Sequence, residues 1–246
     1  MIVEQKDIEK ELADLRSALE QSEQDNLALL RSVSHDIKAP LNQLHALSTL
    51  LNLTGENLTD EQKEYVDRMD IVVKEGLTLI RNLLDLREVD YRSIQYREDE
   101  IDVDQVLQKV IGELGSLAVR KDIRLSSDIE SIRSRLDEVY TARVFDNLIS
   151  NAIKYTPLGG MVHIDLTNEV KYLALSVANE GQSIPTQEED NLFKKFSILS
   201  PRPTAGENTS GIGLYVAQKM AQGMDGYIEH ISDAPITTFR AILPIR

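Results

Sequence analysis

The sequence predicts a fold of the α plus α/β class. A helical hairpin would form a dimeric four-helix bundle with an N-terminal coiled coil, and a two-layer α/β sandwich would follow. Three observations lead to this fold. Residues 1–53 carry a heptad repeat, a second amphipathic helical pattern follows a short turn, and strand and helix patterns are interspersed beyond residue 99. At 246 residues the chain is long enough for two domains.

The composition argues against several classes of protein. The chain has 41 acidic and 27 basic residues and a formal net charge of −14, so we expect no direct contact with nucleic acid. It has no cysteine, which excludes disulfides and thiolate metal sites. No apolar run approaches the roughly 20 residues that span a bilayer. We therefore expect a cytoplasmic chain without membrane contact of its own, either complete or as the cytoplasmic portion of a longer protein.

Residues 1–53 are predicted to form one long helix. One set of residues in this helix recurs at alternating intervals of four and three positions. This spacing is typical of the residues that form the seam of a coiled coil. The seam consists of Ile8, Leu12, Leu15, Leu19, Ser22, Asn26, Leu29 and Val33, and continues at Ile37, Leu41, Leu44, Leu47 and Leu51. A polar residue such as Asn26 in the seam fixes the register and favours two strands. A single amphipathic helix packed on its own domain is the alternative, but the charged remainder of the helix favours an intermolecular coiled coil.

His35 lies off this seam, at a position that faces solvent. Pro40 follows within the same helical pattern. A proline inside a helix removes one hydrogen bond and usually bends the helix, so we expect a kink just after His35.

Turn-forming residues at 54–59 separate the first helix from a second one, which is expected over 60–88 with Thr59 or Asp60 as its N-cap. The apolar face of this second helix consists of Val66, Met69, Val73, Leu77, Ile80, Leu83 and Leu84. A lone hairpin cannot bury both of its apolar stripes. We therefore expect a homodimer through residues 8–88, in which two hairpins form a four-helix bundle.

The remainder of the chain alternates between helix and strand patterns after a polar linker. Helices are expected over 103–117, 137–155 and 213–224, and strands over 123–125, 131–136, 161–167, 172–178, 226–231 and 237–243. The helix over 137–155 should turn Val139, Val144, Leu148 and Ala152 inward, and Asn168 and Glu169 should form a turn. Residues 179–210 lack periodicity, and such a long segment inside a compact domain is a functional lid or is disordered.

Four polar residues of the 137–155 helix share one face. Asn147, Asn151, Lys154 and Tyr155 stand at i, i+4, i+7 and i+8. Amide oxygens can ligate Mg²⁺, and a lysine can neutralise phosphate, so the stripe suits a nucleotide with its metal ion. An ordinary solvent-facing stripe explains these four residues equally well.

A glycine pair precedes the helix over 213–224. Gly211 and Gly213 permit close approach of the backbone, and the helix start offers free N–H groups to an anion. By itself this pattern also arises from simple turn chemistry.

Taken in order, these clusters resemble the motifs of the sensor histidine kinases of two-component systems. Residues 34–41 resemble the histidine box of that family, and residues 147–155 match its asparagine box. Residues 179–184 stand in the place of the first glycine box, 192–196 resemble the phenylalanine box, and 209–214 resemble the second glycine box. The asparagine box and the order of the five motifs are the specific part of the likeness, which covers roughly the chain from residue 30 onward.

The resemblance implies an ATP-dependent protein-histidine kinase. His35 would attack the γ-phosphate of ATP, and Asp36 would hold the imidazole tautomer and accept its proton. The phosphoryl group would then pass to an aspartate in the receiver domain of a response regulator. Asn151 would ligate Mg²⁺, and Phe193 and Phe196 would anchor the lid. The residues implied around ATP are Asn147, Asn151, Lys154, Tyr155, Asn179, Gly181, Ile184, Phe193, Phe196, Gly211, Gly213 and Leu214.

The resemblance also suggests the domain boundaries. We expect a coiled-coil signalling helix over 1–29, a dimerisation and histidine-phosphotransfer domain over 30–90, a linker over 91–98 and a catalytic ATP-binding domain over 99–246.

Two rival functions follow from the same residues. A degenerate kinase would act as a dimeric signalling module with weak ATP binding. A plain ATPase would share the fold, but ATPases of this kind carry a glutamate, one helical turn before the metal-binding asparagine, to activate water. Asn147 stands there and cannot act as a base, which favours transfer to histidine.

Several positions depart from the family pattern. Asn179 stands where the family has an aspartate that accepts from the adenine amino group, so we expect weaker ATP binding. Ser183 and Thr209 replace glycines of the two glycine boxes. Ala39 stands four residues after His35, where phosphatase-competent members carry Thr or Asn, so we expect little or no phosphatase activity.

The other histidines are expected to be structural or at the surface. His45, His163 and His230 have no partners at the spacing of metal ligands.

Overall fold

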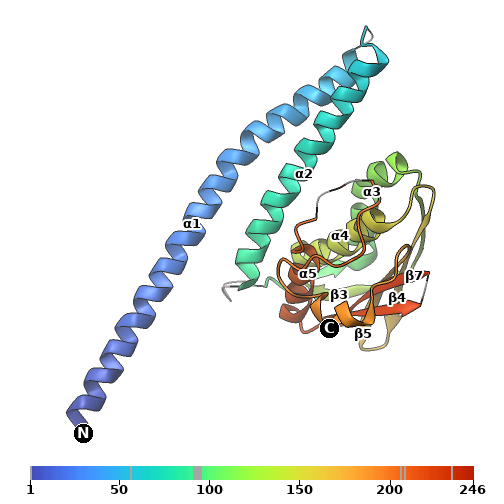
Figure 1. Ribbon diagram of the computed structural model, residues 1–246. Coiled ribbons are helices and arrows are strands. Elements are labelled where there is room, and N and C mark those ends of the chain that lie inside the picture. The colour runs from blue at the N-terminus through green and yellow to red at the C-terminus, as the bar shows by residue number, and fades with distance from the viewer. Residues whose placement is uncertain (1, 56, 91–95, 206, 208, 234) are drawn as a thin grey trace. The chain divides into compact units, whose positions relative to one another are not determined.

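The structure is a computed structural model that describes residues 2–55, 57–90, 96–205, 207, 209–233 and 235–246. The chain divides into two compact units, residues 1–92 and 93–246. The first is helical, and the second combines helices with a sheet (Figure 1). Of the predicted linker over 91–98, residues 91–95 lie outside the described part of the chain.

The first unit is a hairpin of two helices, α1 (Ile2–Thr54) and α2 (Asp60–Asp90), that pack along each other (Figure 1). Thr59 caps α2, as predicted: its hydroxyl accepts from the Gln62 amide at 3.2 Å, and the Gln62 side chain accepts from the Thr59 amide at 2.9 Å. This reciprocal pair is a capping box, which satisfies two free amides at the start of a helix. Helix α1 stays helical through Pro40, and its ribbon changes direction in the lighter blue part of its length (Figure 1).

Much of the apolar seam remains exposed after the two helices pack. Val66, Val73 and Leu86 of α2 are buried. The exposed large apolar residues of the hairpin include Leu12, Leu15, Leu29, Val33, Ile37, Leu44, Leu47, Leu51, Met69 and Leu83. The predicted seam residues Ile8, Leu19 and Asn26 have side chains outside the described part of the structure. Within one chain, then, the hairpin covers only part of its apolar surface.

The second unit is a two-layer α/β sandwich, as predicted. Its five-stranded sheet has the order β2 (Arg124–Ile129), β4 (Met161–Glu169), β5 (Tyr172–Glu180), β7 (Ile236–Pro244) and β6 (Tyr227–Asp233). Strands β2 and β4 are parallel and the other neighbours are antiparallel. Helices α3 (Val103–Arg120), α4 (Glu138–Tyr155) and α5 (Gly213–Gly223) form the second layer (Figure 1).

The core of this unit lies between the helices and one face of the sheet. Successive residues of a strand point to opposite faces, and every second residue of the central strands is fully buried. These residues are Val162, Ile164 and Leu166 of β4 and Leu173, Leu175 and Val177 of β5, which meet Val144, Leu148 and Ala152 from the predicted inner face of α4. Val139, in contrast, is 67% exposed, so its predicted inward position was wrong; it lies five positions before Val144, which at about 100° per residue turns it away from the buried face of α4.

The structure corrects the predicted strands in detail. A short strand β1 (Asp99–Asp102) pairs with β3 (Arg133–Leu136), although three of its four residues are acidic and gave no strand signal. Asn168 and Glu169 belong to β4, and the turn comes after them, where Val170 adopts a positive φ of 64°. Within residues 179–210, β5 ends at Glu180 and a 3-10 helix, η1 (Thr186–Asn191), follows.

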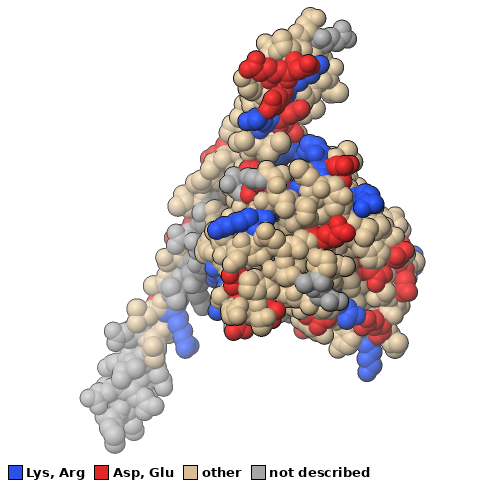
Figure 2. Space-filling view, turned by 45° about the vertical axis from the view of Figure 1, so that its right-hand side comes forward, with Lys and Arg blue, Asp and Glu red and all other residues tan. Residues whose placement is uncertain are grey.

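Acidic and basic side chains are scattered over the face shown in Figure 2, and acidic ones gather near the tip of the hairpin, where α2 begins with Asp60 and Glu61. None of the described helices combines the length and apolar character needed to cross a membrane.

Candidate functional site

His35 and Asp36 form an exposed pair on α1. The His35 side chain is 85% exposed, and its Nδ1 lies 3.5 Å from Oδ1 of Asp36. Adjacent residues of a helix do not normally face each other, yet here the carboxylate reaches the imidazole. Within the described chain the Nε2 atom makes no hydrogen bond, so this nitrogen is available to an incoming group.

The position of the polar face of α4 depends on where the helix begins, and this point is fixed by an N-cap. Asp137 is the N-cap: its Oδ1 accepts from the Tyr140 amide at 3.1 Å, and its Oδ2 accepts from the Arg97 amide at 2.9 Å. From this start the helical period brings Asn147 and Asn151 to one face. Asn147 is buried and donates to the Arg143 carbonyl at 2.8 Å, whereas the half-buried Asn151 side chain makes no hydrogen bond with the described part of the chain.

The second glycine box packs directly on this face. A Cβ on Gly213 would lie 2.9 Å from Oδ1 of the buried Asn147, so a larger residue would force that side chain or the start of α5 to shift. Gly211 has a φ of 65°, and a Cβ there would lie 2.5 Å from the Ser197 carbonyl. The half-buried Tyr155 hydroxyl lies 3.4 Å from Oγ1 of Thr209, within hydrogen-bond distance. The structure therefore brings the predicted asparagine box and second glycine box together.

Asn179 stands at the end of β5 with its side chain buried. Its Nδ2 donates to the Glu180 carbonyl at 3.1 Å, which leaves Oδ1 as an acceptor. Thr237 is the cross-strand partner of Asn179 on β7, and directly opposed residues share one face of a sheet. The Thr237 hydroxyl is also buried and has no hydrogen-bond partner within the described chain. An acceptor and an unpaired hydroxyl thus lie side by side, as a polar ligand would require.

The remaining predicted residues lie in the loop between β5 and α5, except Leu214, which is the second residue of α5. Gly181, Ile184 and Leu214 are half-buried. Phe193 is half-buried, but Phe196 is 62% exposed and adopts a positive φ of 58°. Phe196 is therefore not a buried anchor for this loop. Leu192 is the buried side chain of this stretch, because the 3-10 helix before it turns that position toward the core.

Sequence reasoning missed Lys121, which joins this loop to α4. Its side chain is almost fully buried, and Nζ donates to the carbonyls of Ile153 and Lys154, to Thr204 Oγ1 and to Glu207 Oε1. Lys121 belongs to no motif and follows directly after α3. No local pattern connects a lysine at this point to a loop 86 positions later.

The other histidines make contacts of a structural kind. His45 Nδ1 lies 2.6 Å from Asp70 Oδ1 and ties α1 to α2. His163, on β4, lies 2.9 Å from Ser126 Oγ. The buried His230 side chain lies 4.0 Å from Glu189, and burial lowers its pKa despite the attraction of that carboxylate.

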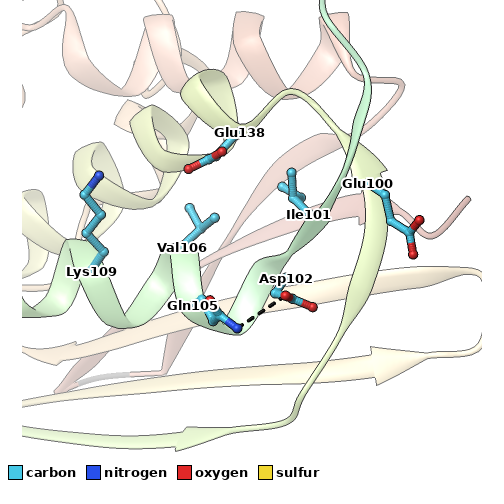
Figure 3. Close-up of a pocket in the computed structure, with 7 residues that line it drawn as sticks. All are labelled: Glu100, Ile101, Asp102, Gln105, Val106, Lys109 and Glu138. Atoms are coloured by element: carbon cyan, nitrogen blue, oxygen red, sulfur yellow. Dashed lines mark hydrogen bonds between the residues drawn. The ribbon is translucent and has the colours of Figure 1, made fainter.

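A hollow of about 340 Å³ lies elsewhere on the second unit, between β1 and the starts of α3 and α4 (Figure 3). Its lining consists of Glu100, Ile101, Asp102, Gln105, Val106, Lys109 and Glu138. Figure 3 shows the Gln105 side chain turned to Asp102. None of the predicted nucleotide-binding residues lines this hollow.

Comparison with known families matches nearly three quarters of the chain to two domain families. Residues 25–92 match the His Kinase A (phospho-acceptor) domain. Residues 136–246 match the histidine kinase-, DNA gyrase B- and HSP90-like ATPase family.

Individual proteins agree with these matches. The heme sensor protein HssS of Staphylococcus aureus (strain MSSA476) is 30% identical over 231 residues, which are 94% of this chain and 49% of the relative. HssS of Staphylococcus saprophyticus is 29% identical over 214 residues, or 87% of this chain and 45% of the relative. The chain thus spans about half the length of these relatives.

Two solved structures share the fold. The Acinetobacter baumannii histidine kinase AdeS has a TM-score of 0.60 and 20% identity, with 86% of this chain and 98% of that chain covered. Full-length ShkA in complex with AMPPNP has a TM-score of 0.62 and 21% identity, with 88% of this chain and 46% of that chain covered.

Proposed function

Because the chain belongs to the sensor histidine kinases of two-component systems, with a phospho-acceptor domain followed by an ATP-binding domain, we propose that it phosphorylates its own His35 from ATP and passes the phosphoryl group to a response regulator. The observation that carries this proposal is the His35–Asp36 pair. An exposed imidazole, oriented by a neighbouring carboxylate, suits a phosphoryl acceptor that two different domains must reach in turn.

The contact between Nδ1 of His35 and Asp36 supports a distinct role for each nitrogen of His35. With Nδ1–H turned toward Asp36, the lone pair of Nε2 attacks the γ-phosphorus of ATP. The new N–P bond forms as the bond between phosphorus and the bridging oxygen breaks, and ADP leaves. The Nδ1 proton passes to the Asp36 carboxylate, which leaves the imidazole ring of phosphohistidine uncharged and the negative charge on its phosphoryl group. The protein otherwise contributes position and charge, as phosphoryl transfer requires.

The residues around β5, α4 and α5 fit ATP. The adenine amino group would donate to Asn179 Oδ1, and the Thr237 hydroxyl would find its missing partner on the base or on a bridging water. Asn147 and Lys154 would face the phosphates, together with the free amides at the start of α5. The fixed orientation of Asn179 supports an intact adenine site over the degenerate alternative.

Binding of Mg²⁺ would depend on Asn151. Its amide has no hydrogen-bond partner in the described chain, so its oxygen is free to ligate. The described residues include no group of three or more acidic or histidine side chains that could hold a metal alone, which suits Mg²⁺, an ion usually held by one or two protein ligands, phosphates and waters. When bound, the ion would neutralise charge on the phosphates.

The exposed apolar seam supports a homodimer. Leu44, Leu47 and Leu51 of α1 and Met69 of α2 remain exposed in one chain, and exposed apolar stripes on a hairpin are buried when two hairpins form a four-helix bundle. The response regulator would dock on this bundle to reach phosphorylated His35. We place this reaction in the cytoplasm, with the chain as the transmitter part of a longer sensor.

A labelling experiment tests the proposal. The full chain is incubated with γ-labelled ATP and Mg²⁺, and His35→Gln is compared with His163→Gln, a substitution of a half-buried histidine on β4, as a matched control. We expect acid-labile, alkali-stable label in the wild type and in the control, and none in His35→Gln. Released phosphate without labelled protein would point instead to an ATPase, and neither product would point to a degenerate module.

A further inference from the structure

The loop between β5 and α5 is attached to the C-terminal end of α4 by one of its short segments. The Thr204 amide donates to the Lys154 carbonyl at 3.2 Å, and the Thr204 hydroxyl donates to the Thr156 carbonyl at 2.5 Å. Glu207 accepts from the Ala205 amide at 2.9 Å, which closes the segment on itself. These contacts hold Thr204, Ala205 and Glu207 beside the helical turn that bears Lys154.

Lys121 strengthens this attachment, because its side chain bonds both to α4 and to the loop. The residue is 4% exposed, and its ammonium meets four oxygens: the α4 carbonyls of Ile153 and Lys154 at 2.9 Å each, Thr204 Oγ1 at 2.7 Å and Glu207 Oε1 at 2.9 Å. A cation at the C-terminal end of a helix interacts favourably with the helix dipole. A buried charge also requires an ionic partner, which Glu207 supplies. We call Lys121, Thr204 and Glu207 the Lys121 clamp.

We propose that the Lys121 clamp positions the loop for nucleotide binding. This inference rests on the proposed function. The clamp holds one end of the loop at the helical turn of Lys154 and Tyr155, and Tyr155 in turn contacts Thr209 just beyond the clamp. Lys121 touches neither the phosphates nor His35 in this scheme. It is a positioning residue that acts through the loop and through the end of α4.

The physical basis is preorganisation. A loop that is already held in place loses less conformational freedom when a ligand orders it, and the ligand binds more tightly as a result. Without the ammonium, the Glu207 carboxylate would leave its buried position for water, and Thr204 would lose one of its bonds. ATP itself would then have to order the part of the loop that contains Thr204 and Glu207. The free-energy cost of this ordering lowers the affinity for ATP and leaves the rate of phosphoryl transfer unchanged.

Lys121→Met is the test variant, because it keeps a long apolar stem and removes the charge. Lys109→Met is the matched control, since Lys109 is exposed on α3 and makes no contact with the loop. Thr204→Val is a second variant that removes the hydroxyl and leaves the bonds between Lys121 and α4 in place. All variants are made in the full chain, and their melting curves establish that they are folded.

Two measurements decide the question. In nucleotide-free protein, exchange of the backbone amide of residue 204 should rise at least about tenfold in Lys121→Met and Thr204→Val, while exchange in β4 and β5 stays unchanged. Titration with ATP and Mg²⁺ should show about tenfold weaker binding in both variants, and the KM for ATP should rise with kcat changed less than about twofold. Lys109→Met should match the wild type throughout.

The outcomes separate this inference from the proposed function. Unchanged exchange at Thr204, or ATP binding as tight as in Lys109→Met, overturns the role of the clamp and leaves the histidine kinase intact. A fall in kcat with unchanged KM also overturns it, because that pattern belongs to a general loss of folded enzyme. Wild-type protein that binds ATP but never labels His35 overturns the proposed function and leaves the clamp standing. Wild-type protein that binds no ATP overturns both.

Discussion

Nδ1 of His45 lies 2.6 Å from Oδ1 of Asp70, and this pair joins the two helices of the hairpin. Asp70 also accepts from Ser48 at 3.3 Å and pairs with Lys74 at 2.8 Å, and its side chain is only 15% exposed. Burial raises the pKa of Asp70, but the hydrogen bonds and charges of Lys74 and His45 outweigh this effect, so that its pKa is lowered overall.

The stability of the hairpin should therefore depend on this carboxylate. We expect Asp70→Asn to lower the free energy of unfolding by about 1.5–3 kcal/mol at pH 7, the range for hydrogen bonds to a charged group. A lowered pKa means that the stabilisation is present above the unfolded pKa, near 3.8, and is lost as the pH falls through the lower folded value. The free energy of unfolding of the wild type and of Asp70→Asn is measured by denaturation at several values between pH 2 and 7. The difference between the two proteins should shrink toward acid pH, and a difference that grows there would contradict the prediction.

Asn179→Asp should tighten ATP binding. A hydrogen bond to a charged acceptor is worth about 1 kcal/mol more than a bond to a neutral one, which corresponds to roughly fivefold in affinity. The carboxylate also loses the bond that the Asn179 amide donates to Glu180, so the nucleotide-free protein should melt at a lower temperature. Calorimetric titration with ATP measures the affinity. Asn168→Asp, at the exposed end of β4, is the matched control; equal or weaker binding in Asn179→Asp would show that Asn179 does not contact adenine.

Ala39→Thr should introduce phosphatase activity. Ala39 is exposed one helical turn after His35 and carries no polar group that could orient a water molecule. The threonine hydroxyl supplies one, on the same face of α1 as the histidine. Dephosphorylation of a phosphorylated regulator, followed over time, should be near the background rate with wild-type protein and faster with the variant. Ala46→Thr, exposed on the same helix, controls for the added hydroxyl; fast dephosphorylation by the wild type would refute the prediction.

Leu47→Glu should break the homodimer. Leu47 is exposed on the seam of α1, and a charge at a seam position would be buried without a partner when two hairpins pair. We expect a shift from dimer to monomer in sedimentation at micromolar concentration, and no phosphorylation of His35 if the reaction crosses between chains. Val119→Glu, exposed on α3, should remain dimeric. A Leu47→Glu protein that stays dimeric would place the interface elsewhere.

Local patterns in the sequence were sufficient for much of the architecture. The heptad spacing predicts α1, and the turn-forming residues that end with Thr59 predict the start of α2, because caps and periodicity act within a few residues. The spacing of Asn147, Asn151, Lys154 and Tyr155 likewise places them on one face of α4, since the helical period alone decides it. The strand β1 escaped prediction because its residues are acidic, and only the pairing with β3 makes it a strand.

The helices and strands, and the residues that share a face within each, follow from the order of the amino acids, because they depend on contacts between near neighbours. Which of these elements meet depends on contacts between distant parts of the chain, which appear only in the folded protein. Asp70 lies 25 positions from His45 and Glu207 lies 86 positions from Lys121, and no period in the sequence links such pairs. Thr237 comes to lie beside Asn179 through the register of β5 and β7 alone. Burial then gave these polar groups their importance, because a polar atom removed from water requires a partner that only the folded chain or its ligand can supply.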